Sequence, residues 1–224
     1  MPAKIRYKCL ILDHDDTAVD STASIHYPAH VEVMKQIRPN EEPVSLEGWF
    51  RKNFDPGIME FLKDELKFSE KELQKEYDIW REYATQKIPK FYTGFIALLN
   101  KFQQSGGIIT VVSHSEVDVI QKHYANKAFN GAKLPDLVFG WDMDAERRKP
   151  SIYPVNQILK TYKLQPHEAL IIDDLKPAVK MAKNSGIPIA AAGWAHQIPI
   201  IQDYMKTNCN FYLESISDLE NLIF

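Results

Sequence analysis

Carboxylates are concentrated where a short apolar segment ends near the N-terminus. Residues 9–12 are CLIL, and they are followed at once by DHDDT at residues 13–17. The apolar segment has the length and composition of a buried strand, without the alternation of a strand that has one wet face. Three carboxylates within four residues repel one another unless a cation joins them. Asp13 and Asp15 are therefore candidates for a site that binds positive charge.

Further polar side chains follow two later apolar segments, and a basic run lies between those segments. These candidates are Ser113, Lys149, Asp173 and Asp174. In open α/β sheets, ligand sites lie at the carboxyl ends of parallel strands. We therefore expect these four side chains to meet Asp13 and Asp15 at one edge of a sheet.

A pocket with more carboxylates than cations suits a hard divalent cation with oxygen ligands. Once such a cation is bound, the pocket can accept a phosphate group, because the metal and a lysine offset its charge. The Ser113 hydroxyl and N–H groups at a helix N-terminus can hold phosphate oxygens. A carboxylate can attack phosphorus, and a second carboxyl can protonate the leaving alcohol and later activate water. We assign the attack to Asp13 and the proton transfers to Asp15.

The elements that must position these residues alternate between strand and helix patterns after residue 91. This alternation predicts a mostly parallel sheet with right-handed crossovers. The expected strands are 9–12, 108–112, 137–139, 169–172, 187–191 and 210–213. The expected helices are 93–104, 116–125, 151–162, 177–184 and 217–222.

Residues 22–90 carry patterns of helical period and almost no strand signal. The helices expected there are 26–36, 44–53, 57–66 and 69–83. Ser69 and Glu72 form a predicted capping box at the start of the last one. A block of this size directly after the first strand cannot belong to the sheet. We predict an inserted helical cap over 22–90 and a catalytic core over 1–21 and 91–224.

Composition sets limits on partners and location. The formal net charge of -3 gives no electrostatic footprint for nucleic acid or anionic membranes. Cys9 and Cys209 form no CxxC pair, and MPAKIRYK leads into the first strand without a signal-peptide pattern. We expect a cytoplasmic protein that binds neither nucleic acid nor membrane, with a monomer or weak homodimer as its assembly.

The motifs together resemble the haloacid dehalogenase superfamily, specifically its phosphatases with an inserted helical cap. The matching residues, in chain order, are Asp13-His14-Asp15-Asp16-Thr17 for DxDx(T/V), Ser113, Lys149-Pro150 and Asp173-Asp174. Val19-Asp20-Ser21 is similar to the phosphoglycolate phosphatase and β-phosphoglucomutase branch. His14 departs from the usual apolar or aromatic residue, and Asp16 replaces a common glycine.

The resemblance implies a Rossmann-like three-layer core, Mg²⁺ as cofactor and a small phosphorylated metabolite as substrate. It implies that the Asp13 carboxylate, the Asp15 backbone carbonyl and Asp174 hold the metal, with Asp173 in support. Ser113 and Lys149 would bind the transferring phosphoryl group. The activity implied is hydrolysis of a phosphomonoester through an aspartyl-phosphate.

Weaker candidates have plain structural alternatives. His114 is predicted to contact the phosphate, while Ser113 could equally cap a helix. Arg51 is predicted to contact substrate from the cap, with a solvated helix face as the alternative. Arg147 and Arg148 are interpreted as solvated loop charges. The histidines interpreted as surface or packing residues are His26, His30, His123, His167 and His196. For Trp194-Ala195-His196, which follows the fifth expected strand, a place at the border of the site is the alternative to packing.

Other activities share parts of this pattern. A β-phosphoglucomutase-like sugar phosphomutase would use every core residue named, and a non-catalytic regulator could bind a phosphate ligand in the same pocket. A dehalogenase would not need Asp15 or the metal set, and a phosphonatase would need a cap lysine in a recognisable pattern. The identity of the substrate is not predicted.

Overall fold

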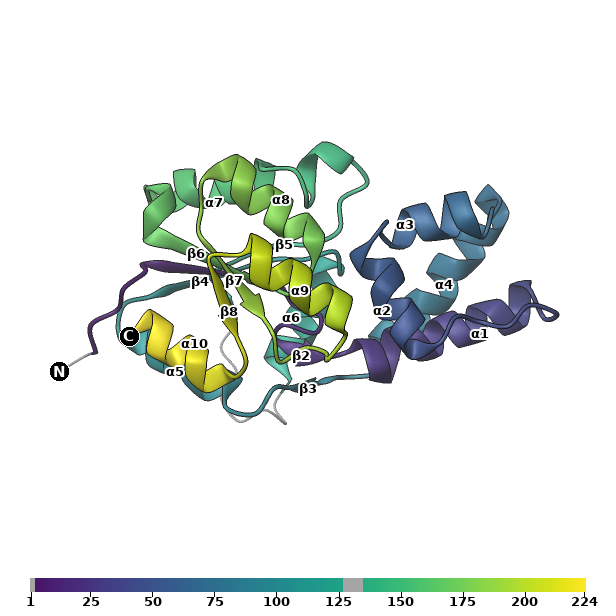
Figure 1. Cartoon of the computed structure of the whole chain (residues 1–224), viewed down its shortest axis with the longest axis horizontal. Helices are drawn as coiled ribbons and strands as arrows, with labels where there is room; N and C mark the ends of the chain where they lie inside the picture. The colour runs from purple at the N-terminus through teal and green to yellow at the C-terminus, as the bar shows by residue number, and fades with distance from the viewer. Residues whose placement is uncertain (1–2, 127–134) are drawn as a thin grey trace. The chain divides into compact units, whose positions relative to one another are not determined.

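The computed structural model describes residues 3–126 and 135–224, which form two compact units (Figure 1). Asp20–Lys90 makes the helical unit. The residues up to Val19 together with Phe91–Phe224 make the core unit. The chain passes between them through β2 (Val19–Asp20) and β3 (Lys90–Phe91), two short paired strands that the sequence did not predict. That the core unit carries out catalysis and that the helical unit serves as a cap are still predictions.

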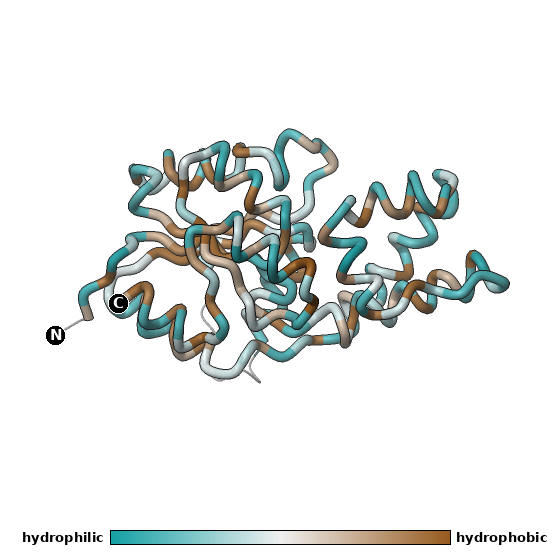
Figure 2. The backbone as a smooth tube through the Cα atoms, viewed as in Figure 1, coloured by the Kyte–Doolittle hydropathy of each residue, from teal (hydrophilic) through white to brown (hydrophobic). Residues whose placement is uncertain are grey.

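The core unit is built on a six-stranded sheet with the order β5-β4-β1-β6-β7-β8. Every neighbouring pair in it is parallel, so the predicted Rossmann-like architecture is confirmed. The strands are β1 (Cys9–Leu12), β4 (Ile108–Val112), β5 (Leu137–Phe139), β6 (Ala169–Asp173), β7 (Ile189–Ala192) and β8 (Phe211–Leu213). Figure 2 shows hydrophobic residues concentrated along these strands, as a sheet covered on both faces requires.

The register of the central strands decides which polar residues meet. Leu12 at the end of β1 pairs with Val111 in β4 and Ile172 in β6. Asp13 is therefore level with the last residues of both neighbours. Its N–H donates to the Ile172 carbonyl at 2.9 Å, which continues the ladder by one residue. The strand ends at the edge of the sheet are thereby fixed by backbone hydrogen bonds.

Helices cover both faces of this sheet. In Figure 1, α7 (Tyr153–Tyr162) and α8 (Lys176–Ser185) lie on one face, and α5 (Phe95–Gln104) and α10 (Ile216–Ile223) lie on the other. Within the described part of the core unit, the remaining helical segments are α6 (Val117–Ala125), α9 (Pro199–Asn208) and the 3₁₀ turns Ala145–Arg147 and Pro166–Glu168. Helix α9 was not predicted, although Pro199 in its first turn is a recognised start signal.

The helical unit contains the four predicted helical segments. They are α1 (Tyr27–Ile37), α2 (Leu46–Phe54), α3 (Ile58–Glu60) and α4 (Glu70–Gln86), with π-helical turns at Thr22–His26 and Phe61–Glu65. The predicted capping box is confirmed, since both reciprocal bonds between Ser69 and Glu72 are present. Helix 57–66 was predicted as continuous, but it changes to π-helical hydrogen bonding at Phe61. This unit has its own apolar core, which includes Val33, Trp49, Phe61, Leu62 and Ile79.

A histidine is buried in the core of the helical unit. His30 is 3% exposed, and its ring stacks on Trp49 with 4.2 Å between centroids. Burial lowers the pKa of His30 from 6.5 to about 4. His30 is thus a packing residue, as its sequence context suggested.

We expect the free energy of unfolding to fall as the pH drops from about 6.5 to about 4. In this range His30 is protonated in the unfolded chain but stays neutral in the folded protein, so protonation favours the unfolded state. The loss attributable to His30 is at most about 3 kcal/mol. Urea unfolding at pH 7.5 and pH 5 should show a smaller pH effect in His30→Gln than in the wild type. His167→Gln, at an exposed histidine, is the control. An equal pH effect in wild type and His30→Gln would contradict this assignment.

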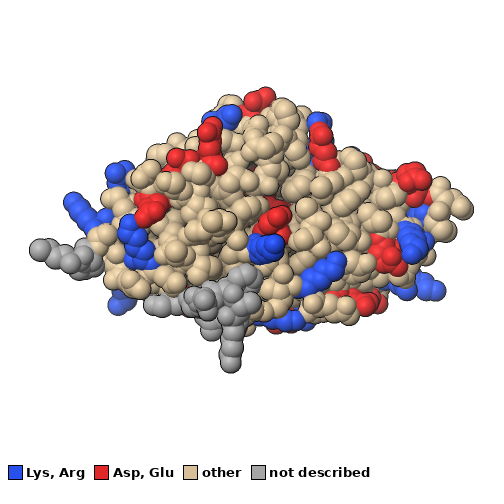
Figure 3. All heavy atoms as spheres, turned by 90° about the horizontal axis from the view of Figure 1, so that it is seen from below, with Lys and Arg blue, Asp and Glu red and all other residues tan. Residues whose placement is uncertain are grey.

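No helix among the described residues is long and apolar enough to cross a membrane. On the face drawn in Figure 3, the described basic and acidic side chains are interspersed. This distribution agrees with the formal net charge of -3.

Candidate active site

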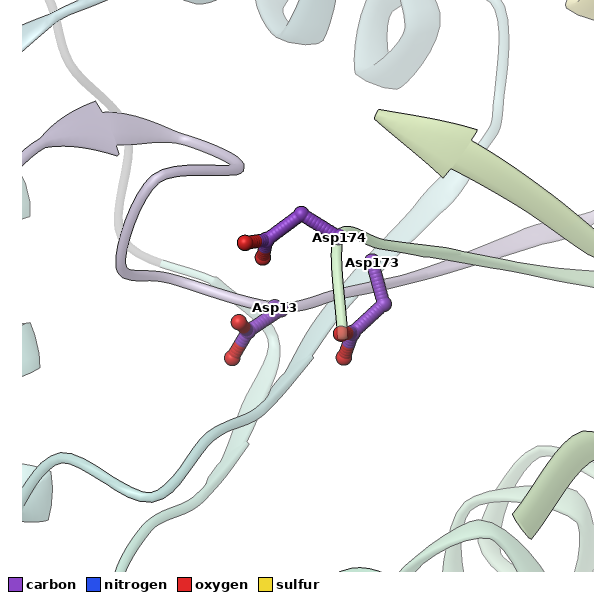
Figure 4. Close-up of side chains that lie close together, drawn as sticks. All are labelled: Asp13, Asp173 and Asp174. Atoms are coloured by element: carbon purple, nitrogen blue, oxygen red, sulfur yellow. The ribbon is translucent and has the colours of Figure 1, made fainter. Parts of the chain in front are cut away.

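Three carboxylates converge at the carboxyl edge of the sheet. Asp13 follows β1, Asp173 is the last residue of β6, and Asp174 comes next (Figure 4). One oxygen from each lies within 4.8 Å of the others. All three residues are at most 4% exposed. The structure therefore brings together three of the residues that the sequence placed at a metal site.

Lys149 joins this cluster as a buried cation. Its Nζ lies 2.8 Å from Asp13 Oδ1 and 2.7 Å from Asp173 Oδ2. Burial alone would lower the pKa of Lys149, but the charges of Asp13 and Asp173 outweigh it and raise the pKa. The lysine is therefore a fixed positive charge, and it neutralises only part of the carboxylate charge.

The remaining negative charge shows in the two neighbouring aspartates. Burial and the charge of Asp13 raise the pKa of Asp174 to about 8, against the lowering effects of Lys149 and the Thr17 hydroxyl. Burial also raises the pKa of Asp173 well above its ordinary value. Such carboxylates favour a second positive charge at the site. Their all-oxygen donor set fits a hard divalent cation such as Mg²⁺.

The DHDDT segment forms a tight turn that presents its carboxylates. Asp16 has φ of 55° and donates its N–H to the Val19 carbonyl at 2.7 Å. A left-handed residue here explains why glycine suits the position and why aspartate is tolerated. The Thr17 hydroxyl donates to Asp174 Oδ1 at 3.1 Å. Thr17 therefore steadies both the turn and a candidate metal ligand.

Ser113, Asp15 and Ser115 meet at the end of β4. The Ser113 side chain is 2% exposed, and its Oγ accepts the N–H of Ser115 at 3.2 Å. The Ser115 hydroxyl donates to Asp15 Oδ2 at 2.5 Å. Sequence reasoning did not assign Ser115 a role. Its position two residues after a strand end, near Ser113, was the only available signal.

His114 contacts the loop that carries Lys149. Its Nε2 lies 2.8 Å from the Lys149 carbonyl, so Nε2–H is the donor. Burial and the charge of Lys149 lower the pKa of His114 to about 4, which makes it a neutral imidazole at pH 7. Its predicted contact with phosphate stays a prediction. The contact that the structure shows is with the backbone of Lys149.

The same loop is closed by Arg148. Its guanidinium lies 4.1 Å from the centre of the Trp141 ring and donates to the carbonyls of Asp142 and Met143. Arg148 is therefore a loop charge, as interpreted, but a half-buried one whose partners lie within its own loop. Arg147 is exposed beside Asp144, as expected.

His14 stands between Asp13 and Asp15 in the sequence and belongs to the core unit. It is fully buried, and its Nε2 lies 2.9 Å from His123 Nδ1. Its ring also packs near Tyr124, with 5.7 Å between centroids. The side chain is therefore part of the packing beneath the site.

Two other predicted residues have mixed outcomes. Arg51 lies on α2 in the helical unit and pairs with Glu47 at 2.6 Å, on a half-exposed helix face. Its predicted substrate contact stays a prediction. His196 was interpreted as a packing residue, yet its Nε2 lies 3.7 Å from Asp174 Oδ2. It therefore borders the acidic cluster, which agrees with the alternative interpretation of this segment rather than with packing alone.

These features define an α/β protein with a buried aspartate–lysine site at the carboxyl edge of a parallel sheet, and comparison with known proteins assigns it to a family. The sequence profile of the haloacid dehalogenase-like hydrolases matches residues 10–192. Phosphoglycolate phosphatases from Vibrio vulnificus strains CMCP6 and YJ016 are each 25% identical over 168 residues, covering 72% of this chain and 68% of theirs. The chain belongs to the haloacid dehalogenase-like hydrolase family.

Solved structures share the fold over nearly the whole chain. A predicted phosphoglycolate phosphatase from Haemophilus somnus 129PT matches with a TM-score of 0.75 and 16% identity, covering 97% of this chain and 98% of that one. CbbY from Rhodobacter sphaeroides, in complex with phosphate, matches with a TM-score of 0.72 and 16% identity, covering 95% and 96%. At these identities the likeness is one of fold.

Proposed function

We propose that this protein is a Mg²⁺-dependent phosphatase that hydrolyses a small phosphomonoester through an aspartyl-phosphate on Asp13. The observation that supports this most is the buried Asp13 carboxylate held 2.8 Å from Lys149. Asp173 and Asp174 are grouped with it, and Asp15 is two residues further along. The phosphoglycolate phosphatases among its relatives point to the same class of substrate.

Asp13 attacks phosphorus with one carboxylate oxygen, and the bond from phosphorus to the leaving alcohol breaks. Asp15 gives a proton to the departing oxygen. In the second half, Asp15 takes a proton from water as the water oxygen attacks phosphorus and frees Asp13. Lys149 and the Ser113 hydroxyl offset and hold the charge of the phosphoryl oxygens, so most of the catalysis is positioning and electrostatics.

Asp13, Asp174 and the Asp15 carbonyl would hold Mg²⁺, with Asp173 supporting the arrangement through Lys149. When bound, the ion neutralises phosphate charge and orients the transferring group. We further propose that the helical unit acts as a cap that excludes water and selects the substrate. Arg51 is the residue of that unit proposed to contact the substrate.

A phosphatase screen over phosphorylated metabolites, with Mg²⁺ and with EDTA, tests this proposal. We expect phosphate release from one compound far above the others, lost with EDTA and restored by Mg²⁺. An isomerised sugar phosphate without free phosphate would identify a mutase instead. Binding of phosphate ligands without turnover of any of them would identify a regulator.

A further inference from the structure

The hydroxyl of Ser115 forms a partly buried hydrogen bond with Asp15, the proposed proton-transfer residue. Ser115 is 3% exposed, and its Oγ donates to Asp15 Oδ2 at 2.5 Å. The two residues come from neighbouring strand ends, after β4 and β1, and lie 100 positions apart in the chain. A donor so close to a carboxylate restricts the rotation of the carboxyl group.

Ser115 itself is held firmly. Its N–H donates to Ser113 Oγ at 3.2 Å, and its carbonyl accepts the Trp141 N–H at 2.9 Å. Gly140 lies directly against it, since a Cβ at Gly140 would come within 2.5 Å of the Ser115 carbonyl oxygen. The backbone on both sides of the hydroxyl is therefore fixed. A fixed donor can orient its partner, whereas a mobile one would follow it.

We propose that Ser115 is a positioning residue that holds Asp15 in the orientation needed for proton transfer. This inference rests on the proposed phosphatase function and on the role of Asp15 in it. With Oδ2 held by the Ser115 hydroxyl, the proton is carried by Oδ1. The Oδ1 proton passes to the departing alcohol oxygen as the Asp13–phosphorus bond forms. Oδ1 takes a proton from water as that bond breaks.

The consequence is a dependence on the leaving group. Glycerol 2-phosphate releases an alkoxide that needs a proton, whereas p-nitrophenyl phosphate releases a stable phenolate that does not. General acid catalysis contributes about 10²–10⁴-fold where a proton is needed. Because kcat/KM reports the steps up to alcohol release, it isolates the proton donated by Asp15 from the later attack of water.

The experiment measures kcat/KM for both probes in Ser115→Ala. We expect a loss of about 10-fold or more with glycerol 2-phosphate and less than about 3-fold with p-nitrophenyl phosphate. Ser115→Thr, which keeps a hydroxyl, should recover most of the activity. Asp15→Asn should show the same leaving-group dependence in a stronger form. Ser115→Cys serves as the second variant if Ser115→Ala does not fold.

Ser185→Ala is the matched control, because its hydroxyl donates to the Ala182 carbonyl at the end of α8. It should leave both kcat/KM values unchanged. An equal loss with both probes in the Ser115 variants would show a merely structural role and overturn the proposal. Absence of phosphate release by the wild-type protein from both probes and from every compound of the metabolite screen would instead contradict the proposed function.

Discussion

Asp13→Asn should abolish turnover, with kcat lowered by roughly 10⁴-fold or more. An amide oxygen is a poor nucleophile, so no covalent bond to phosphorus forms at this position. The substitution preserves the size of the side chain and an oxygen that can accept from Lys149, 2.8 Å away. The loss should therefore reflect chemistry more than folding.

The sharpest measurement is the mass of the intact protein after an acid quench during turnover. The wild type should show a phosphoryl adduct, and Asp13→Asn should show none. Asp16→Asn is the matched control, because it makes the same change three residues away in the same turn, and asparagine also tolerates φ of 55°. Phosphatase activity of Asp13→Asn within about 10-fold of the wild type would sink the nucleophile assignment.

The acidic cluster was predictable from the sequence because only one structural property was required, namely that the strands run parallel. Segments that end in Asp13 and Asp173 must meet if their strands are parallel neighbours, and β1 and β6 are such neighbours. The buried, non-alternating segment CLIL carried that information on its own. The helices of the helical unit were also predictable, because the helical period of apolar residues can be recognised within each short segment.

Contacts across loops were not predictable in this way. Ser115 contacts Asp15, and His196 contacts Asp174, because tertiary packing brings loops together that are far apart in the sequence. His114 was predicted to contact phosphate, and the contact that the sequence did not predict is the one between its imidazole and the Lys149 carbonyl, 35 residues away. Neither periodicity nor motif spacing predicts such contacts, because the conformation of a loop is set by the folded structure around it.

The site combines two requirements that oppose each other. A nucleophilic carboxylate must remain charged, but the same strand ends gather Asp173 and Asp174 beside it. Lys149 resolves part of this conflict, and a metal ion would resolve the rest. The structure of the site therefore depends on its charge balance as much as on its hydrophobic support.

Lys149→Met should reduce kcat by about 10²–10³-fold and also destabilise the metal-free protein by about 3–5 kcal/mol. The first effect follows from losing the cation proposed to hold the phosphoryl oxygens. The second follows because Lys149 Nζ is 2.7 Å from Asp173 and 2.8 Å from Asp13, so its removal leaves buried carboxylates without their cation.

The instability should depend on pH in a defined direction. Asp174 already has a folded pKa of about 8 against 3.8 as its ordinary value, so its ionisation opposes folding increasingly as the pH rises between these values. Without Lys149, which lowers the pKa of Asp174, ionisation of this carboxyl destabilises the folded protein even more. The deficit of Lys149→Met relative to the wild type should be largest near pH 8 and shrink towards pH 5, as the carboxylates take up protons.

Urea unfolding in EDTA at both pH values measures this deficit, and repeating it with Mg²⁺ tests whether a second cation replaces the lost one. Lys101→Met is the control, since Lys101 pairs with Glu220 on an exposed surface and should cost less than about 1 kcal/mol. If Lys149→Met behaved like Lys101→Met, or lost equal stability at both pH values, the ammonium would not be what balances the buried carboxylates. Recovery with Mg²⁺ would show that lysine and metal share that balance.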